Sequence, residues 1–423
     1  MEKKQSVNGK STKSLILEAA FSFYQKTMTK DFSMNELAQK VGLSKPAIYR
    51  HFKNKADVLE AMKTYFFDLM ASKLTEYNGR EKDFSAEELG KQILNTITVF
   101  FVENPQFINY FIYQVTFDPN FLLIMQRELL ERGVFKDIDF FREADDDVYF
   151  FAHDYFFGIS ILFFIKVREQ QINEGKAVKS ADYFAEKLYH FFIGGLRGKS
   201  EPGDFFYPVE IKKDRLKELD SLCAVKPEYL PEENKIFTAL AKVIRKYTVN
   251  GVTIERIAGE LGMAKSSLYF YFENKNQMIL SLVQKELSFL VVLCRENSVE
   301  AKNLSEYVYI SMMTEINFFL KRTSILTICG WLIQTSTDDP RNRNEDPDSN
   351  PLWDRHLGEI TGKIDLGFEM SPSIIRFWIG ILPVAILILK LQNGFTDEKI
   401  IKAVKYIFGF VENGISVNKP NEK

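Results

Sequence analysis

A short motif occurs twice in this chain of 423 residues. It reads GLSKPAIYRHFKNK from residue 42 and GMAKSSLYFYFENK from residue 262, so each position of the first copy has its counterpart 220 residues later, without a gap. Both copies keep a glycine, two lysines, a tyrosine, a phenylalanine and an asparagine. A chain that carries one surface twice is expected to meet a partner that also has two halves.

The residues around the first copy predict two short helices joined by a tight turn. Ser33 and Glu36 have the spacing of a capping box, which starts a helix. Gly42 suits the positive φ at which helices often end, and Ser44 with Pro46 is typical of the start of the next helix. Helix, glycine-containing turn and helix is the helix-turn-helix arrangement.

The second copy predicts the same arrangement with weaker caps. Arg256 stands where the first copy has its capping glutamate, and Ala264 stands where it has its capping serine. Each lost cap costs up to about 1 kcal/mol, so the second turn is expected to be less firmly set. A longer helix is expected after the motif, in the first copy over residues 55–77.

Helical periodicity extends over almost the whole chain, and no stretch alternates convincingly with period two, which predicts an all-α fold. Each half closes with two strongly apolar helices, at residues 154–170 and 181–198 in the first and 373–394 and 397–415 in the second. These helices are more apolar than one buried stripe requires, which indicates a helix–helix interface beyond their own subdomain.

Two polar segments interrupt this pattern. A segment with four prolines and little apolar periodicity separates the halves and predicts a linker, with one short helix over residues 214–222. Residues 336–351 predict a polar loop inside the second half.

Charge is distributed unevenly along the chain. The formal net charge is −2, but residues 1–60 carry +5 and residues 231–285 carry +3, which leaves −10 for the remainder. This asymmetry is expected when only part of a chain meets a polyanion.

Composition argues against secreted and membrane proteins. Three widely spaced cysteines, Cys223, Cys294 and Cys329, predict buried free thiols in a reducing cytoplasm rather than a disulfide framework. The N-terminal residues lack the apolar run of a signal peptide. The longest uncharged apolar run has 13 residues, fewer than the roughly 20 of a membrane span, so a buried helix is the better interpretation and no membrane partner is expected.

No pattern recommends an enzyme. GGLRGKS at residues 194–200 lacks the first glycine of a phosphate-binding loop and predicts a helix end. The four histidines have no ligand spacing, and His153 beside Asp154 is more typical of a solvated acidic helix start than of an acid–base pair. No catalytic residue, metal site or cofactor is therefore predicted.

The two motif regions resemble the DNA-binding domain of the TetR/AcrR family of bacterial transcriptional regulators. The first is SMNELAQKVGLSKPAIYRHFKNKADVL and the second is TIERIAGELGMAKSSLYFYFENKNQMIL. Each match covers about 60 residues; the following regions are similar only in plan. The resemblance implies a cytoplasmic bacterial regulator that binds double-stranded DNA, most simply a repressor controlled by a small molecule.

Members of the family normally form homodimers through their last two helices, so the resemblance implies that this chain carries both protomers as a covalent pseudo-dimer. The predicted domains are a first helix-turn-helix domain at 10–70, a first effector and interface domain at 71–198, a linker at 199–230, a second helix-turn-helix domain at 231–290 and a second effector and interface domain at 291–417.

The resemblance and the docking geometry of such motifs assign roles to the residues of each copy. In the first copy the residues expected to face the groove are Lys45, Pro46, Ala47 and Arg50, and those expected on the DNA backbone are Ser33, Tyr49, His51 and Lys55. In the second copy they are Lys265, Ser266, Ser267 and Phe270, with Thr253, Tyr269, Tyr271 and Lys275 on the backbone. Ile48, Phe52 and Phe272 are expected to pack inside.

An unusual density of aromatic residues in the first half predicts an apolar pocket for an apolar or amphipathic effector, with a solid aromatic core as the alternative. The candidate lining is Phe100, Phe101, Phe107, Tyr110, Phe111, Tyr113 and Phe117. Two other functions stay open: a DNA-bending or anchoring protein without an effector, and a small-molecule-binding or catalytic helical protein with vestigial helix-turn-helix domains.

Overall fold

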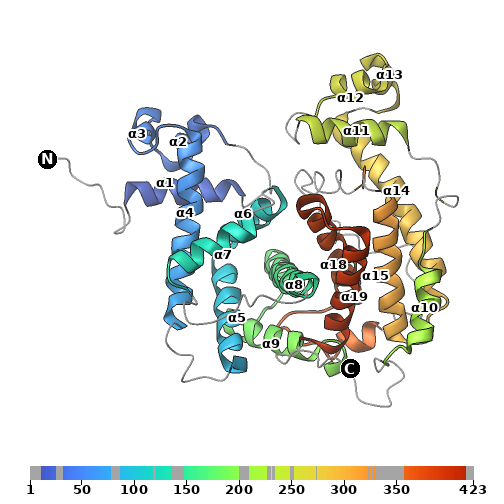
Figure 1. Cartoon of the computed structure of the whole chain (residues 1–423). Coiled ribbons are helices and arrows are strands. Elements are labelled where there is room, and N and C mark those ends of the chain that lie inside the picture. Colours follow the sequence, from blue (N-terminus) through green and yellow to red (C-terminus); the bar gives the residue numbers. More distant parts are fainter. Residues whose placement is uncertain are drawn as a thin grey trace. The chain divides into compact units, whose positions relative to one another are not determined.

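Helices make up the regular structure of the chain, as its periodicity predicts. The computed structural model describes residues 11–24, 32–77, 86–117, 121–134, 147–199, 209–225, 230, 234–247, 252–272, 274–322, 324–325, 328 and 357–415. Within these residues there is no strand, which confirms the all-α fold (Figure 1).

The helices of the first half, in chain order, are α1 Thr12–Phe21, α2 Met34–Val41, α3 Lys45–Tyr49, α4 Lys55–Leu74, α5 Ala86–Glu103, α6 Pro105–Phe117, α7 Phe121–Glu131, α8 Asp147–Asn173 and α9 Ala181–Gly194. Those of the linker and second half are α10 Lys213–Leu222, α11 Lys235–Tyr247, α12 Ile254–Leu261, α13 Lys265–Tyr271, α14 Lys275–Ser298, α15 Leu304–Lys321, α18 Pro372–Asn393 and α19 Asp397–Asn413.

Within the described residues, the helices occur where the sequence predicts them. A short 3-10 turn extends α4 to Tyr77, the predicted end of the long helix. The linker helix α10 agrees with its prediction within one residue, and α8, α9, α18 and α19 occupy the four apolar segments. The predicted polar loop at 336–351 lies outside the described residues.

The chain packs as two compact units that cut across the repeat. One unit contains α1 to α7, and the other contains α8 together with α10 to α19, while α9 is divided after Glu186. The bounds of the five segments predicted from the sequence remain predictions.

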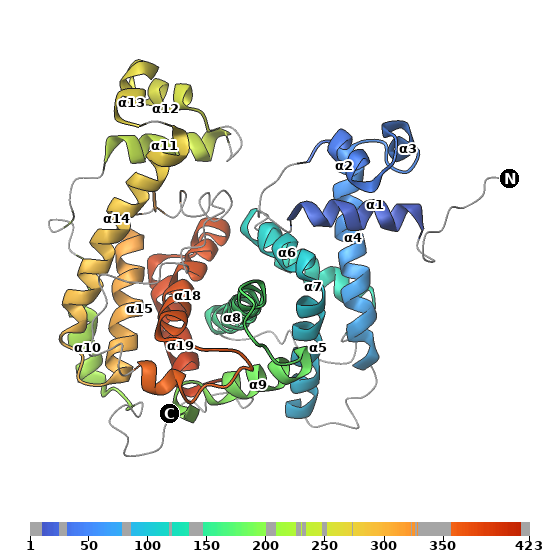
Figure 2. The same cartoon turned by 180° about the vertical axis from the view of Figure 1, so that it is seen from behind.

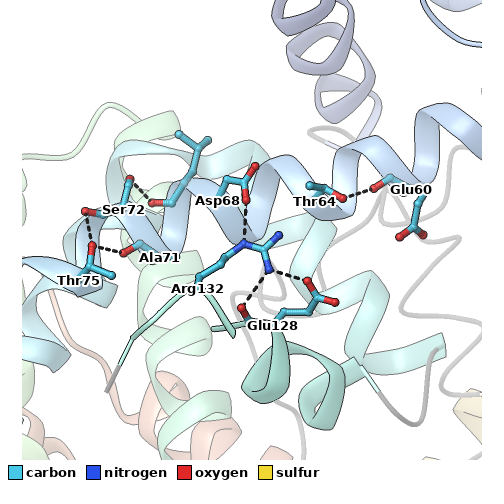
Figure 3. A network of polar contacts seen from close by, with 9 residues as sticks. Glu60, Thr64, Asp68, Ala71, Ser72, Thr75, Glu128 and Arg132 are labelled. Atoms are coloured by element: carbon cyan, nitrogen blue, oxygen red, sulfur yellow. Dashed lines mark hydrogen bonds and ion pairs between the residues drawn. The ribbon is translucent and has the colours of Figure 1, made fainter. Parts of the chain in front are cut away.

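In the first unit, α4 runs from the helix-turn-helix element into a core of aromatic rings. Phe66 and Phe67 on α4 are fully buried. Near the far end of α4, Arg132 donates to Asp68 over 2.8 Å and to the carboxylate of Glu128 over 2.6 Å (Figure 3). These bonds connect α4 to the end of α7.

In the second unit, α8 of the first half packs against α18 and α19 of the second half. Both views show α8 beside α18 (Figures 1 and 2). The buried Trp378 on α18 donates its indole N–H to Ser160 on α8 over 2.9 Å. On the other side of α18 and α19 lies α15, which packs in turn on α14.

The ends of α9 and α19 meet through two reciprocal backbone hydrogen bonds. The N–H of Leu196 donates to the carbonyl of Val411, and the N–H of Ile415 donates to the carbonyl of Phe192, each over 2.8 Å. Leu196 corresponds to Ile415 and Phe192 to Val411 at one common offset of 219 residues. This is the pattern of a two-fold interface, in which each bond has its symmetry mate.

Two glycines make this close approach possible. Gly195 and Gly414 both have positive φ, 55° and 74°. A Cβ on Gly195 would lie 2.4 Å from the backbone nitrogen of Gly414, and a Cβ on Gly414 would lie 2.1 Å from the carbonyl oxygen of Ile193. Neither position has room for a side chain.

One segment of α14, Gln277–Ser298, is long and apolar enough to cross a membrane by length and composition alone. The core helix of a soluble protein can pass the same test, and α14 packs along α15.

Candidate nucleic-acid interface

The first helix-turn-helix element is α2, the turn at Gly42 and α3. Ser33 and Glu36 form the predicted capping box: the Ser33 hydroxyl accepts from the N–H of Glu36 over 3.1 Å, and the Ser33 N–H donates to the Glu36 carboxylate over 2.8 Å. Gly42 ends α2 with φ 73° in the left-handed region. Ser44 then caps α3 by accepting from the N–H of Ala47 over 3.4 Å.

The inner face of this element is packed as predicted. Ile48 on α3 is fully buried and Phe52 is 3% exposed. Their burial fixes the rotation of α3, so the opposite face of the helix points to solvent.

The predicted DNA-contacting residues lie on α3, at its end and at the starts of α2 and α4. Exposed side chains are Ser33, Lys45, Pro46, Tyr49, Arg50 and His51, while Ala47 and Lys55 are half-buried. The ammonium of Lys45 lies 5.9 Å from the ring centroid of Tyr49, and that of Lys55 lies 5.2 Å from the ring centroid of Phe32. Partial burial lowers the pKa of Lys55 from its ordinary value.

The second element repeats this construction with the predicted loss of caps. The Thr253 hydroxyl accepts from the N–H of Arg256 over 3.3 Å, but α12 has no capping box. Gly262 ends α12 with φ 68°, and Ala264 begins α13 without a side-chain hydrogen bond. Leu268 is 1% exposed and takes the place of Ile48.

The outer face of α13 differs from that of α3. Lys265, Ser266, Tyr269 and Phe270 are exposed, and Thr253 and Ser267 are half-buried; the side chains of Tyr271 and Lys275 lie outside the described part of the chain. Phe270 is 84% exposed, which is unusual for a phenylalanine. Phe272, expected to pack inside, is only half-buried.

An ion pair is present in the second element that the sequence reasoning did not foresee. The Lys265 ammonium donates to the carboxylate of Glu255, near the start of α12. This hydrogen bond raises the pKa of Lys265 and lowers that of Glu255, so both groups are charged at neutral pH. Comparison of the copies could have indicated it, because the counterpart of Glu255 is the uncharged Asn35.

The residues predicted to line an effector pocket lie in the aromatic core of the first unit. Five of them are buried: Phe100, Phe101, Phe107, Tyr110 and Phe111. Their ring centroids lie 5.6–6.4 Å from that of Phe66 on α4. Tyr113 is half-buried, and the side chain of Phe117 lies outside the described residues.

A polar cavity of about 360 Å³ lies elsewhere, at the end of α19. The buried carboxyl group of Glu412 lines it and accepts a hydrogen bond from Ser305 on α15. Burial raises the pKa of Glu412 to about 7, against the effects of Ser305 and of the nearby Arg197.

A family model described as bacterial regulatory proteins, tetR family, matches the chain twice, at residues 16–62 and 236–282. The first match extends from α1 into α4 and contains the whole first helix-turn-helix element. The second extends from α11 into α14 and contains the whole second element.

Proposed function

We propose that this chain, which carries two DNA-binding domains of the tetR family of bacterial regulatory proteins in tandem, acts as a ligand-responsive repressor. One chain binds one operator of two half-sites as a single-chain pseudo-dimer. It works by binding and conformational change in the cytoplasm, without catalysing a reaction.

The observation that carries the pseudo-dimer is the reciprocal pair of backbone hydrogen bonds between the ends of α9 and α19. An isologous interface requires that each contact recur with the partners exchanged. The bonds Leu196 to Val411 and Ile415 to Phe192 meet this requirement. The closing helices of the two halves thus pair as the closing helices of two protomers would.

The packing of α8 on α18 and α19 gives the same interface its apolar area. Phe156 and Phe164 on α8 are buried, and their rings lie 6.0 Å and 5.5 Å from that of Trp378. Burial of such large apolar side chains is the main favourable term in helix association. An interface of this kind fits a permanent intrachain dimer better than a transient contact.

The response to a ligand is proposed to run through α4. Phe66 lies among the rings predicted to line the effector pocket. The same helix, α4, begins at Lys55, shortly after α3 and the residues assigned to DNA contact. An apolar or amphipathic compound that separates these rings would shift α4 and, with it, α3. The compound can release DNA only to the extent that it binds the shifted state more tightly.

Operator recognition follows from the two outer faces. Recognition helices of this motif place their N-terminal residues against base edges, and half-sites lie about one helical turn or somewhat more apart. Arg50 can donate two hydrogen bonds to guanine, whereas Phe270 can make only apolar contact, such as with a thymine methyl group. The operator is therefore expected to have two unlike half-sites, the first better specified.

Selection of duplexes from a random library on the purified full chain, followed by sequencing, tests this function. The expected result is a bipartite consensus with one guanine-containing half-site and one weaker, different half-site. Enrichment of a perfect palindrome would contradict the assigned recognition residues, and the absence of any enriched motif would contradict sequence-specific DNA binding.

A further inference from the structure

The two DNA-binding elements have very different charges although they match position by position. Residues 33–55 carry five Lys or Arg and one Glu, a net charge of +4, whereas residues 253–275 carry three of each sign, a net charge of zero. Sequence-independent binding to DNA depends on the number of phosphates that cations neutralise. The second element is therefore the weaker phosphate binder of the two.

The geometry of Glu255 strengthens this difference. Its carboxylate accepts a hydrogen bond from the ammonium of Lys265, which lowers the pKa of Glu255. Lys265 is one of the groups assigned to DNA contact. A carboxylate within the chain thus occupies a side chain that is expected to face DNA.

The first element has no such arrangement. Asn35 occupies the position equivalent to Glu255, and within the described residues Lys45 forms no ion pair. The Lys45 ammonium lies over the ring of Tyr49, as that of Lys265 lies over the ring of Tyr269, so only the ion pair distinguishes the two lysines. Lys45 therefore meets DNA with its charge uncompensated.

The ion pair in the second element is not explained by folding stability. Both side chains are about half exposed, 47% for Lys265 and 56% for Glu255. Exposed ion pairs contribute little to stability, because water and salt screen them. The start of a helix also attracts phosphate groups, so a carboxylate fixed there acts against DNA directly.

We propose that Glu255 is a specificity-determining residue of the second DNA-binding domain: it competes with DNA phosphate for Lys265. This competition weakens the binding of the second domain to non-operator DNA. The proposal rests on the proposed DNA-binding function.

The test exchanges the residues of the two elements in the full chain. Glu255→Asn gives the second element the residue of the first, and Asn35→Glu gives the first element the residue of the second. Binding to a random-sequence duplex is measured by fluorescence anisotropy over a range of salt concentrations. Glu260→Gln is the matched control, because it removes one negative charge from the same helix but leaves Lys265 paired; Glu260 pairs with Lys242 instead.

One additional phosphate contact steepens the dependence of log K on log salt by about 0.9, which corresponds to about fivefold tighter binding near 0.15 M salt. Glu255→Asn is expected to give this gain and Asn35→Glu a loss of similar size, with Glu260→Gln close to the natural chain. Equal effects of Glu255→Asn and Glu260→Gln, or no effect of Glu255→Asn, would overturn the proposal.

The variant Lys45→Ala distinguishes failure of the proposal about Glu255 from failure of the proposed DNA-binding function. If Lys45→Ala weakens DNA binding while Glu255→Asn leaves it unchanged, only the competition by Glu255 is contradicted. If neither variant changes DNA binding, the assignment of these helices to DNA is itself wrong.

Discussion

Arg50, which caps the end of α3, and Phe270 on α13 occupy equivalent positions of two elements that share a lysine and a tyrosine. Both side chains are exposed, so neither is needed for the packing of its domain. A guanidinium can hold the two acceptors of guanine, and a phenyl ring cannot. At this position the two domains are therefore expected to read different bases.

Replacement of Arg50 by alanine is expected to cost about 1–3 kcal/mol of operator affinity and to relax base preference in one half-site only. Binding to a panel of operators with single substitutions measures this. Lys55→Ala is the control, since loss of a phosphate contact weakens binding to all sequences about equally. Relaxed preference in both half-sites after Arg50→Ala would contradict the assignment.

At the scale of single residues, the sequence predicted helix-capping hydrogen bonds better than it predicted side-chain contacts between helices. The bonds of Ser33, Glu36 and Ser44 depend on residues three positions apart, and the structure confirms them. The pair of Glu255 and Lys265 joins two helices across a turn, so no local spacing indicates it. Its only trace in the sequence is a difference in charge between two aligned copies.

The close approach of the ends of α9 and α19 restricts which residues can stand at the contact between these two helices. Gly414 adopts φ 74° and ψ −175°, a conformation open essentially to glycine alone. A side chain there would also meet the backbone of Ile193. The reciprocal hydrogen bonds of Leu196 and Ile415 depend on this approach.

Replacement of Gly414 by alanine is expected to destabilise the chain by more than about 3 kcal/mol, because strain and backbone overlap add. Thermal unfolding followed by circular dichroism measures the change. Gly409→Ala is the control on the same helix: nothing lies within 4 Å of an added Cβ there, and alanine favours a helix over glycine by about 1 kcal/mol. Equal melting temperatures for the two variants would show that the backbone beside Gly414 leaves room for a side chain.

Periodicity was sufficient to predict these elements but not their partners. The four closing helices were expected from their excess of apolar residues, and an interface was expected with them. Which helix packs on which depends on contacts such as Trp378 with Ser160, 218 residues apart. No pattern within one helix contains that information.

For the whole molecule, the repeat predicted two DNA-binding domains, and the two family matches agree with it. The packing of α8 on α18 and α19 agrees with the interface expected for the closing helices. The division of α9 between two compact units was not predicted. The predicted effector pocket is likewise a question of packing: periodicity gathers Phe100, Phe107 and Tyr110, but cannot say whether a compound fits among their rings.

The central claim is that one chain supplies both halves of a dimer, and the mass of the DNA complex tests it most directly. Light scattering on the full chain with a minimal operator duplex is expected to give one chain of 49.1 kDa per duplex. A complex of two chains on that minimal duplex would contradict the claim, because each chain would then supply only one half of the dimer.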